Sequence, residues 1–95
     1  MLVTNEPGIY REGDYGMRLE NMILVTEAFE SEFGRFLKFE QMTWCHFERG
    51  LIDPGLLLAE EKTWLNRYHQ KEYETIGPCL DTVTAAWLKE KTRAL

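Results

Sequence analysis

The sequence predicts an α+β fold in which antiparallel strands come first and a helical hairpin follows. Residues that favour strands dominate as far as Phe47, and turns that contain glycine or charged residues separate them. After Asp53-Pro54 the apolar residues recur at helical spacing, until Gly77-Pro78 interrupts them. These two patterns place the strands in the first half of the chain and the helices in the second.

Three or four strands are expected in the first half, and three of them fall at residues 1–4, 17–26 and 36–47. The first is followed by Glu6 and then by Pro7-Gly8, which has the residues that the two central positions of a type II turn prefer. A proline also biases the residue before it toward an extended backbone. Glu6 is therefore expected at the end of a strand.

Along the second of these strands, successive side chains point to opposite faces. Arg18 and Glu20 fall on one face, which begins polar and ends apolar, as expected of a strand that enters a cleft. The other face is mostly apolar and is expected to be buried; it carries Met17, Leu19, Asn21, Ile23 and Val25.

The first of two expected helices opens at about Leu56. Glu60 and Glu61 lie in its first turn, where acidic side chains complement the helix dipole, and Gly77-Pro78 ends it. Its apolar stripe consists of Trp64, Leu65, Tyr68, Tyr73 and Ile76. We expect the aromatic residues of this region to form a core between the sheet and the helices; a ligand-binding platform is the alternative.

The second helix begins at Asp81 or Thr82 and reaches about Thr92. Either of the first two residues has a side chain that accepts a hydrogen bond from the first turn of a helix. No internal repeat, low-complexity segment or long linker interrupts the chain.

Composition and charge disfavour several classes of partner. The chain has 95 residues and a net charge of −5, and its eleven Lys and Arg form no basic stripe, which argues against nucleic acid and anionic membranes. No apolar run approaches the roughly 20 residues of a membrane span, and the amino terminus shows no export signal. Two cysteines without a dense spacing pattern fit a reducing compartment. The sequence thus predicts a soluble, cytoplasmic protein.

Both cysteines, Cys45 and Cys79, are expected to be free thiols. A zinc site built from them together with His46 and His69 is the alternative. Adjacent residues in a strand point to opposite faces, so Cys45 and His46 would not face the same ion. We therefore expect His46, in a strand, and His69, in a helix, to be structural residues.

Glu6 and Glu20 are the candidate metal ligands. Carboxylate oxygens are hard ligands that can bridge two divalent ions about 3.5–4 Å apart, and such a pair of ions activates water and polarises a scissile carbonyl. Arg18 lies on the face of Glu20 and could orient a ligating or substrate carboxylate. By residue type alone, a solvated and salt-bridged face is the more common arrangement for such residues.

The sequence contains three blocks that match a known pattern, VTNEPGIY at residues 3–10, GMRLEN at 16–21 and FLKFE at 36–40. These blocks resemble the carboxy-terminal part of the Xaa-Pro aminopeptidases (aminopeptidase P), members of the M24 metallopeptidases with the pita-bread catalytic fold. The extra carboxy-terminal segment of larger, multi-domain members is similar to three later stretches, at residues 51–53, 63–69 and 86–92. The resemblance implies that residues 1–50 end the catalytic domain and that residues 51–95 form a helical extension.

The resemblance implies a two-metal site. Members of this family bind two divalent ions, commonly manganese, through two aspartates and a histidine earlier in the sequence and one glutamate in each of the blocks that here contain Glu6 and Glu20. Glu6 would ligate one ion and accept a proton, Glu20 would bridge both ions, and Arg18 would be the supporting arginine. The implied reaction is hydrolysis of the Xaa-Pro bond at a peptide amino terminus, so the implied substrates are peptides with proline at the second position.

The chain opens only five residues before Glu6, so the two aspartates and the histidine of the family are absent. Two carboxylates alone should not hold a metal pair tightly, and we expect the 95-residue chain alone to be inactive. The alternative is a non-catalytic module, because pita-bread folds also occur in proteins that bind other proteins. A homodimer contact is also expected, through a cluster formed by Leu51, Ile52, Leu56, Leu57 and Leu58.

Overall fold

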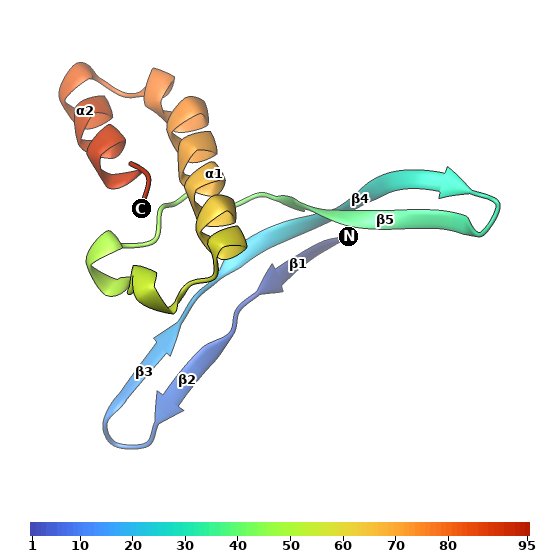
Figure 1. Cartoon of the computed structure of the whole chain (residues 1–95), viewed down its shortest axis with the longest axis horizontal. Coiled ribbons are helices and arrows are strands. Elements are labelled where there is room, and N and C mark those ends of the chain that lie inside the picture. The colour runs from blue at the N-terminus through green and yellow to red at the C-terminus, as the bar shows by residue number, and fades with distance from the viewer. The chain divides into compact units, whose positions relative to one another are not determined.

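The computed structural model describes all of residues 1–95 and places five strand segments before two α-helices (Figure 1). The chain folds as two compact units, Met1–Thr43 and Trp44–Leu95. Every strand lies in the first unit and both α-helices lie in the second. This arrangement confirms the expected α+β class, with antiparallel strands followed by a helical hairpin. The expected division of catalytic domain and extension at residues 50 and 51 stays a prediction.

Three antiparallel pairings build the first unit. The strand β4 (Asn21–Ser31) lies between β1 (Leu2–Asn5) and β5 (Gly34–Gln41), and β2 (Gly8–Arg11) pairs separately with β3 (Tyr15–Arg18). All neighbouring strands run in opposite directions. The β4–β5 hairpin contains a bulge between Glu27 and Phe29, where one extra residue interrupts the pairing.

The strand boundaries differ from the expected ones. The expected strand at 17–26 is interrupted at residues 19–20 and then continues to Ser31, and the pairing strand at 8–11 was not predicted. The expected strand at 36–47 was too long, because the ladder ends at Gln41.

The strand expected at 36–47 ends early because the residues after it make other contacts, all within the second unit. The Cys45 N–H donates to the Tyr68 hydroxyl oxygen at 3.3 Å, and that hydroxyl donates to the Cys45 carbonyl oxygen at 3.0 Å. The Phe47 N–H donates to Nε2 of His69 at 3.1 Å. Side chains of the first α-helix thus satisfy backbone groups that a strand partner would otherwise have satisfied.

In the first unit, buried side chains occur only at the start of β4. Asn21 and Ile23 are each 9% exposed, whereas Met17 and Leu19, on the face expected to be buried, are 55% and 53% exposed. The expectation was therefore correct only from Asn21 onward. Met17 lies in a two-stranded ribbon, which has no third strand beside it.

In the second unit, α1 (Ala59–Ile76) and α2 (Thr82–Lys91) form the helical hairpin. Three short 3₁₀ turns precede and connect them, at Arg49–Leu51, Pro54–Leu56 and Gly77–Cys79. The first helix starts later than predicted because residues 54–56 form one of these turns, capped by the Asp53 side chain.

The signals that predict the two helices are confirmed. Glu60 and Glu61 lie in the first turn of α1, and the Glu61 carboxylate also accepts a hydrogen bond from the Leu58 N–H at 2.7 Å. Asp81 caps α2 by accepting from the Thr84 N–H at 2.8 Å.

The core of the second unit is centred on Tyr68, which is 4% exposed. Its ring stacks on three other rings, at centroid distances of 5.4 Å to Trp44, 5.4 Å to Trp64 and 5.6 Å to Phe47. Leu88 on α2 is 3% exposed. Tyr68 therefore packs against these three rings, although Trp64 remains 49% exposed. The hydroxyl of Tyr68 is occupied by the backbone bonds to Cys45.

Candidate metal-binding residues on the long hairpin

Glu6 and Glu20 lie opposite each other across a long hairpin, in which β1 and β2 form one side and β3 and the start of β4 form the other. The β1–β4 and β2–β3 ladders share one register, which continues across the two residues that separate them on each strand. In this register Glu6 faces Glu20, and Pro7 faces Leu19, whose N–H donates to the Pro7 carbonyl oxygen at 3.0 Å. Residues directly opposite in an antiparallel pair project from the same face. The two carboxylates therefore share one face of the hairpin, and Glu6 follows the end of β1 as predicted.

The hydrogen-bonding pattern brings these two residues close together. Because Leu19 bonds to Pro7, the adjacent pair of Glu6 and Glu20 occupies a non-hydrogen-bonded position of the ladder. Opposite Cα atoms at such positions are typically about 4.5 Å apart, the closer of the two antiparallel spacings. Two carboxylates at this spacing are within reach of a common ion or of two adjacent ions.

Arg18 contacts Glu20 on this face. Its Nη2 atom lies 3.1 Å from Oε2 of Glu20, and the side chains are 52% and 41% exposed. The prediction that the two residues share a face of the strand is confirmed. An ion pair this exposed adds little to stability. Its consequence is geometric, because it fixes the direction of one carboxylate oxygen of Glu20.

Tyr10 is a further residue of this face that sequence reasoning passed over. A Cβ atom at Gly8 would lie 2.7 Å from the Tyr10 hydroxyl, and one at Gly16 would lie 2.7 Å from Cδ1 of the ring. The ring therefore lies over both glycines, with its hydroxyl directed back along the strand. The signal in the sequence was the pair of glycines that flank Tyr10 on the same face.

The carboxylates of Glu6 and Glu20 suit a hard divalent ion, but they are too few to complete its coordination shell. Carboxylate oxygens suit Mg²⁺, Ca²⁺ and Mn²⁺ better than soft ions. The chain contains no group of three or more His, Cys, Asp or Glu side chains that could hold a metal ion. Glu6 and Glu20 can thus supply part of a coordination shell, and the remaining ligands would come from elsewhere.

The zinc alternative is not supported by the second unit. Cys45 and Cys79 are both free, as predicted, and both are exposed. His46 does not lie in a strand, contrary to expectation, and its Nδ1 atom pairs with Oε1 of Glu72 at 3.2 Å. His69 is 1% exposed and accepts a backbone hydrogen bond. Both histidines therefore have structural partners.

Comparisons with known proteins show which family the chain resembles. Residues 1–27 match the model of metallopeptidase family M24, and residues 35–95 match the model of the C-terminal region of peptidase M24. A probable Xaa-Pro aminopeptidase P of Coprinopsis cinerea is 42% identical over 97% of this chain, and Aminopeptidase P1 of Arabidopsis thaliana is 42% identical over the same share. The chain spans 16% and 15% of the length of these two relatives.

A solved structure also resembles the chain. It is the X-prolyl aminopeptidase of Caenorhabditis elegans, described as a cytosolic enzyme with a di-nuclear active site. The match has a TM-score of 0.86 and 33% identity, and it covers 99% of this chain and 16% of the other. Neither α1 nor α2 combines the length and apolar composition that crossing a membrane requires.

Proposed function

Because this chain belongs to the M24 metallopeptidases, as their carboxy-terminal region, we propose that it contributes two metal ligands to an Xaa-Pro aminopeptidase. The observation that carries the proposal is the position of Glu6 directly opposite Glu20, with Arg18 bonded to the latter. The relatives that bear this enzyme's name support the reaction class. The substrates would be peptides with proline at the second position.

Each residue has a distinct role in this proposal. When bound, two divalent ions would activate a water molecule and polarise the scissile carbonyl. Glu6 would help to hold one ion and would accept a proton. Glu20 would help to hold both ions. Arg18 would hold Oε2 of Glu20 in place through their 3.1 Å contact. Its positive charge would also offset the charges of the two adjacent carboxylates.

Manganese is the metal that we propose, because members of the family commonly use it and hard carboxylate oxygens suit it. We also propose that residues 1–50 end the catalytic domain, that residues 51–95 form its helical extension, and that the intact enzyme is cytoplasmic. The solved relative that is described as cytosolic supports the last point. The chain alone would hold metal weakly and would be inactive, because two carboxylates leave most of the coordination shell to water.

The test is Mn²⁺-dependent release of the first residue from an Xaa-Pro tripeptide. We expect activity from the full-length protein that contains this chain and none from residues 1–95 alone. Glu20→Gln in the full-length protein should lower kcat/KM by at least about 100-fold, since changes even beyond the direct ligands cost 10–100-fold.

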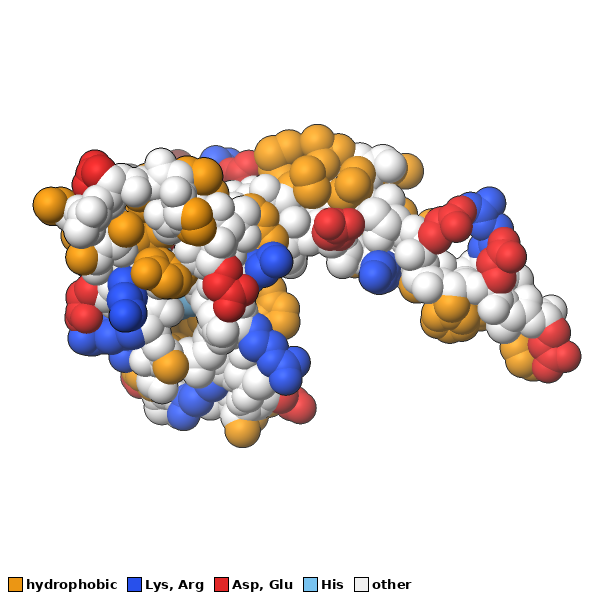
Figure 2. Space-filling view, turned by 90° about the horizontal axis from the view of Figure 1, so that it is seen from above, with side chains coloured by type: hydrophobic (Ala, Val, Ile, Leu, Met, Phe, Trp, Pro, Cys, Tyr) orange, Lys and Arg blue, Asp and Glu red, His pale blue; other side chains and the backbone are white.

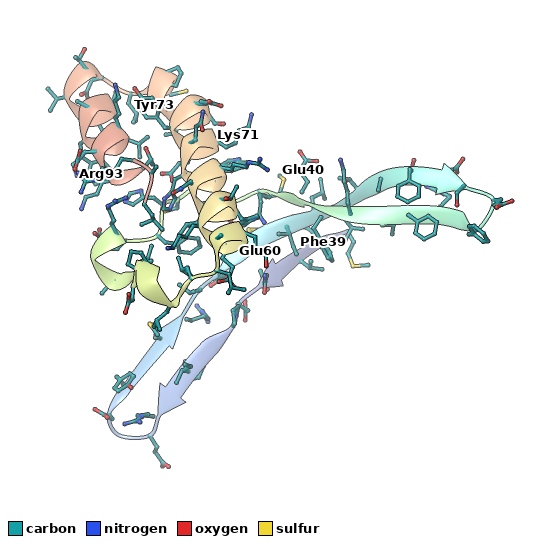
Figure 3. All side chains as sticks on the ribbon, in the orientation of Figure 1. Phe39, Glu40, Glu60, Lys71, Tyr73 and Arg93 are labelled. Atoms are coloured by element: carbon teal, nitrogen blue, oxygen red, sulfur yellow. The ribbon has the colours of Figure 1, made fainter.

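Glu40→Gln is the matched control for that variant. Glu40 lies opposite Leu24 in the β4–β5 ladder, so it projects from the same face of the sheet as Glu20 but stands outside the carboxylate pair. Figure 3 shows Glu40 and Phe39 on opposite sides of β5. An intact enzyme that is inactive with every divalent ion, or a Glu20→Gln variant as active as Glu40→Gln, would contradict the proposal.

A homodimer contact or protein-binding module is the second candidate function for the carboxy-terminal unit. Leu51, Leu56 and Leu58 are 85%, 82% and 61% exposed around the two 3₁₀ turns that precede α1. A cluster of exposed leucines at adjacent turns is typical of an interaction surface.

Sedimentation of the full-length protein tests the dimer. We expect a dimer that Leu51→Glu and Leu56→Glu together convert to a monomer, because burying two carboxylates in an apolar contact is costly. Val83→Glu is the control, since Val83 is 81% exposed on α2 and lies outside the cluster. A protein that is monomeric at every concentration would rule the contact out.

A further inference from the structure

The start of β4, next to Glu20, is held by the end of β5, which lies on the opposite side of β4 from β1. Asn21 is 9% exposed, and its Nδ2 atom donates to Oε1 of Gln41 at 3.2 Å. Gln41 is the last residue of β5. Asn21 and Glu20 are adjacent, so their side chains project to opposite faces. The amide contact therefore holds the strand from the face opposite the two carboxylates.

Thr43 extends this support by one backbone bond. The Met42 N–H donates to the Met22 carbonyl oxygen at 2.9 Å, as in a regular antiparallel ladder. A regular ladder would return the bond from the Met22 N–H to the carbonyl oxygen of Met42. Here that N–H donates instead to Oγ1 of Thr43 at 2.9 Å. The Thr43 hydroxyl thus replaces a backbone acceptor at the point where β5 has ended.

These contacts matter because the other neighbour of Glu20 provides little support. Pro7 has no N–H, so its pair with Leu19 contains one hydrogen bond where a regular pair has two. Glu6 and Glu20 themselves occupy a non-hydrogen-bonded position. On the side of the β1 and β2 strands, the backbone around Glu20 therefore has one hydrogen bond fewer than a regular ladder would give it. The contacts of Gln41 and Thr43 compensate on the side of β5.

We propose that Gln41 and Thr43 are positioning residues for the metal site, which hold the start of β4 so that the Glu20 carboxylate stays opposite that of Glu6. This role rests on the proposed function, because it assumes that Glu20 binds metal. Neither residue would touch the ions or the substrate. Gln41 acts through the side chain of Asn21, and Thr43 acts through the backbone N–H of Met22.

Calorimetric titration of the metal-free, full-length protein with Mn²⁺ alone tests the proposal, together with the midpoint of thermal unfolding measured without metal. Thr43→Val and Gln41→Leu should each weaken Mn²⁺ binding by roughly tenfold, the lower end of the effect of residues that orient metal ligands. Thr43→Ser keeps the hydroxyl and should bind as the unaltered protein does.

Thr26→Val is the matched control. It removes a hydroxyl from β4 in the same way, but Oγ1 of Thr26 is buried without a hydrogen-bond partner, so no contact to the start of the strand is lost. We expect it to leave Mn²⁺ affinity unchanged.

The outcomes separate the two proposals. If Thr43→Val and Gln41→Leu lower only the unfolding midpoint and bind Mn²⁺ as the unaltered protein does, the residues are merely structural and the positioning role is wrong. Equal weakening by Thr26→Val would also overturn it. If the unaltered full-length protein binds no Mn²⁺, the metal site itself is wrong and the positioning role falls with it.

Discussion

His69 is the most deeply buried side chain of the helical unit, with 1% of its surface exposed. Its Nε2 atom accepts the hydrogen bond of the Phe47 N–H, so the ring must be neutral with its proton on Nδ1. That Nδ1 atom is buried and has no partner. Protonation of the ring would remove the acceptor and place a second cation beside Arg49 and close to His46.

The surroundings of His69 predict how stability depends on pH. Burial, then the charges of His46 and Arg49, lower the pKa of His69 below its ordinary value of 6.5. The unfolded chain therefore binds this proton first as the pH falls. The contribution of neutral His69 to the stability of the fold is complete above about pH 6.5, and it declines as the pH falls from there toward the lowered pKa. Urea unfolding of the chain should accordingly give a smaller free energy at pH 5.5 than at pH 7.5.

His69→Gln provides the comparison, because a glutamine can accept the Phe47 N–H without titrating. His46, Glu72 and Arg49 all remain in this variant, so the comparison isolates the loss of the His69 imidazole. We expect the loss of stability between pH 7.5 and 5.5 to shrink. If the variant shows the same loss as the unaltered chain, His69 is not the group responsible.

Among the elements, α2 depends most visibly on a single side chain. Asp81 accepts from the Thr84 N–H at 2.8 Å and from the Thr84 hydroxyl at 2.9 Å. These hydrogen bonds lower the pKa of Asp81, the backbone one contributing most. The cap is therefore complete in the ionised form and is lost as the pH falls through that lowered pKa.

Replacement of Asp81 should affect α2 selectively. Asp81→Ala removes the cap and is expected to lower the midpoint of thermal unfolding by a few degrees and to speed amide exchange in the first turn of α2. Asp81→Asn retains an acceptor of similar capping strength and should behave as the unaltered chain does. Unchanged exchange in the alanine variant would show that the cap is dispensable.

The helices were predictable because their signals are local. Asp81 and Gly77-Pro78 act within a few residues of where they stand, so each boundary follows from the neighbouring sequence. The strand expected to reach Phe47 could not be bounded in this way. It ends early because Tyr68 and His69, more than twenty residues away in the chain, take over the backbone hydrogen bonds of Cys45 and Phe47.

The candidate site was predictable in part for the same reason. Alternation along one strand places Arg18 beside Glu20, and that contact is present. The opposition of Glu6 and Glu20 depends on how two strands align, which a single strand does not reveal. The supporting contacts of Gln41 and Thr43 required a third strand and the point at which it stops.

At the scale of the whole molecule, burial is uneven between the two units. In the first unit Ile23 is the only buried apolar side chain, whereas the second unit buries Leu65, Tyr68 and Leu88. Large apolar side chains are exposed on the β4–β5 hairpin, among them Phe29 and Phe33 at 60% and 83%. Figure 2 shows hydrophobic and acidic side chains interspersed at the outer end of that hairpin. The sheet of the first unit thus has little core of its own.

The two units should therefore differ when they are separated. Residues 44–95 alone should keep the helical circular dichroism signal and unfold cooperatively, because the Tyr68 cluster lies entirely within them. Residues 1–43 alone should lack a stable sheet, since a few strands need a covered apolar face to persist in water. Slow amide exchange in the isolated first unit would contradict this expectation.

The single register of the long hairpin also limits which insertions and deletions the site can accept. Glu6 and Glu20 each stand one residue beyond the β1–β4 ladder, so one residue inserted between Asn5 and Glu6 would turn that carboxylate to the other face. Beyond Pro7 and Leu19 the hairpin can lengthen or shorten if both strands change equally. With the turn kept, the spacing between the two glutamates can therefore change only in steps of two. The part of the hairpin beyond the two glutamates can therefore change in length while Glu6 and Glu20 stay on the same face.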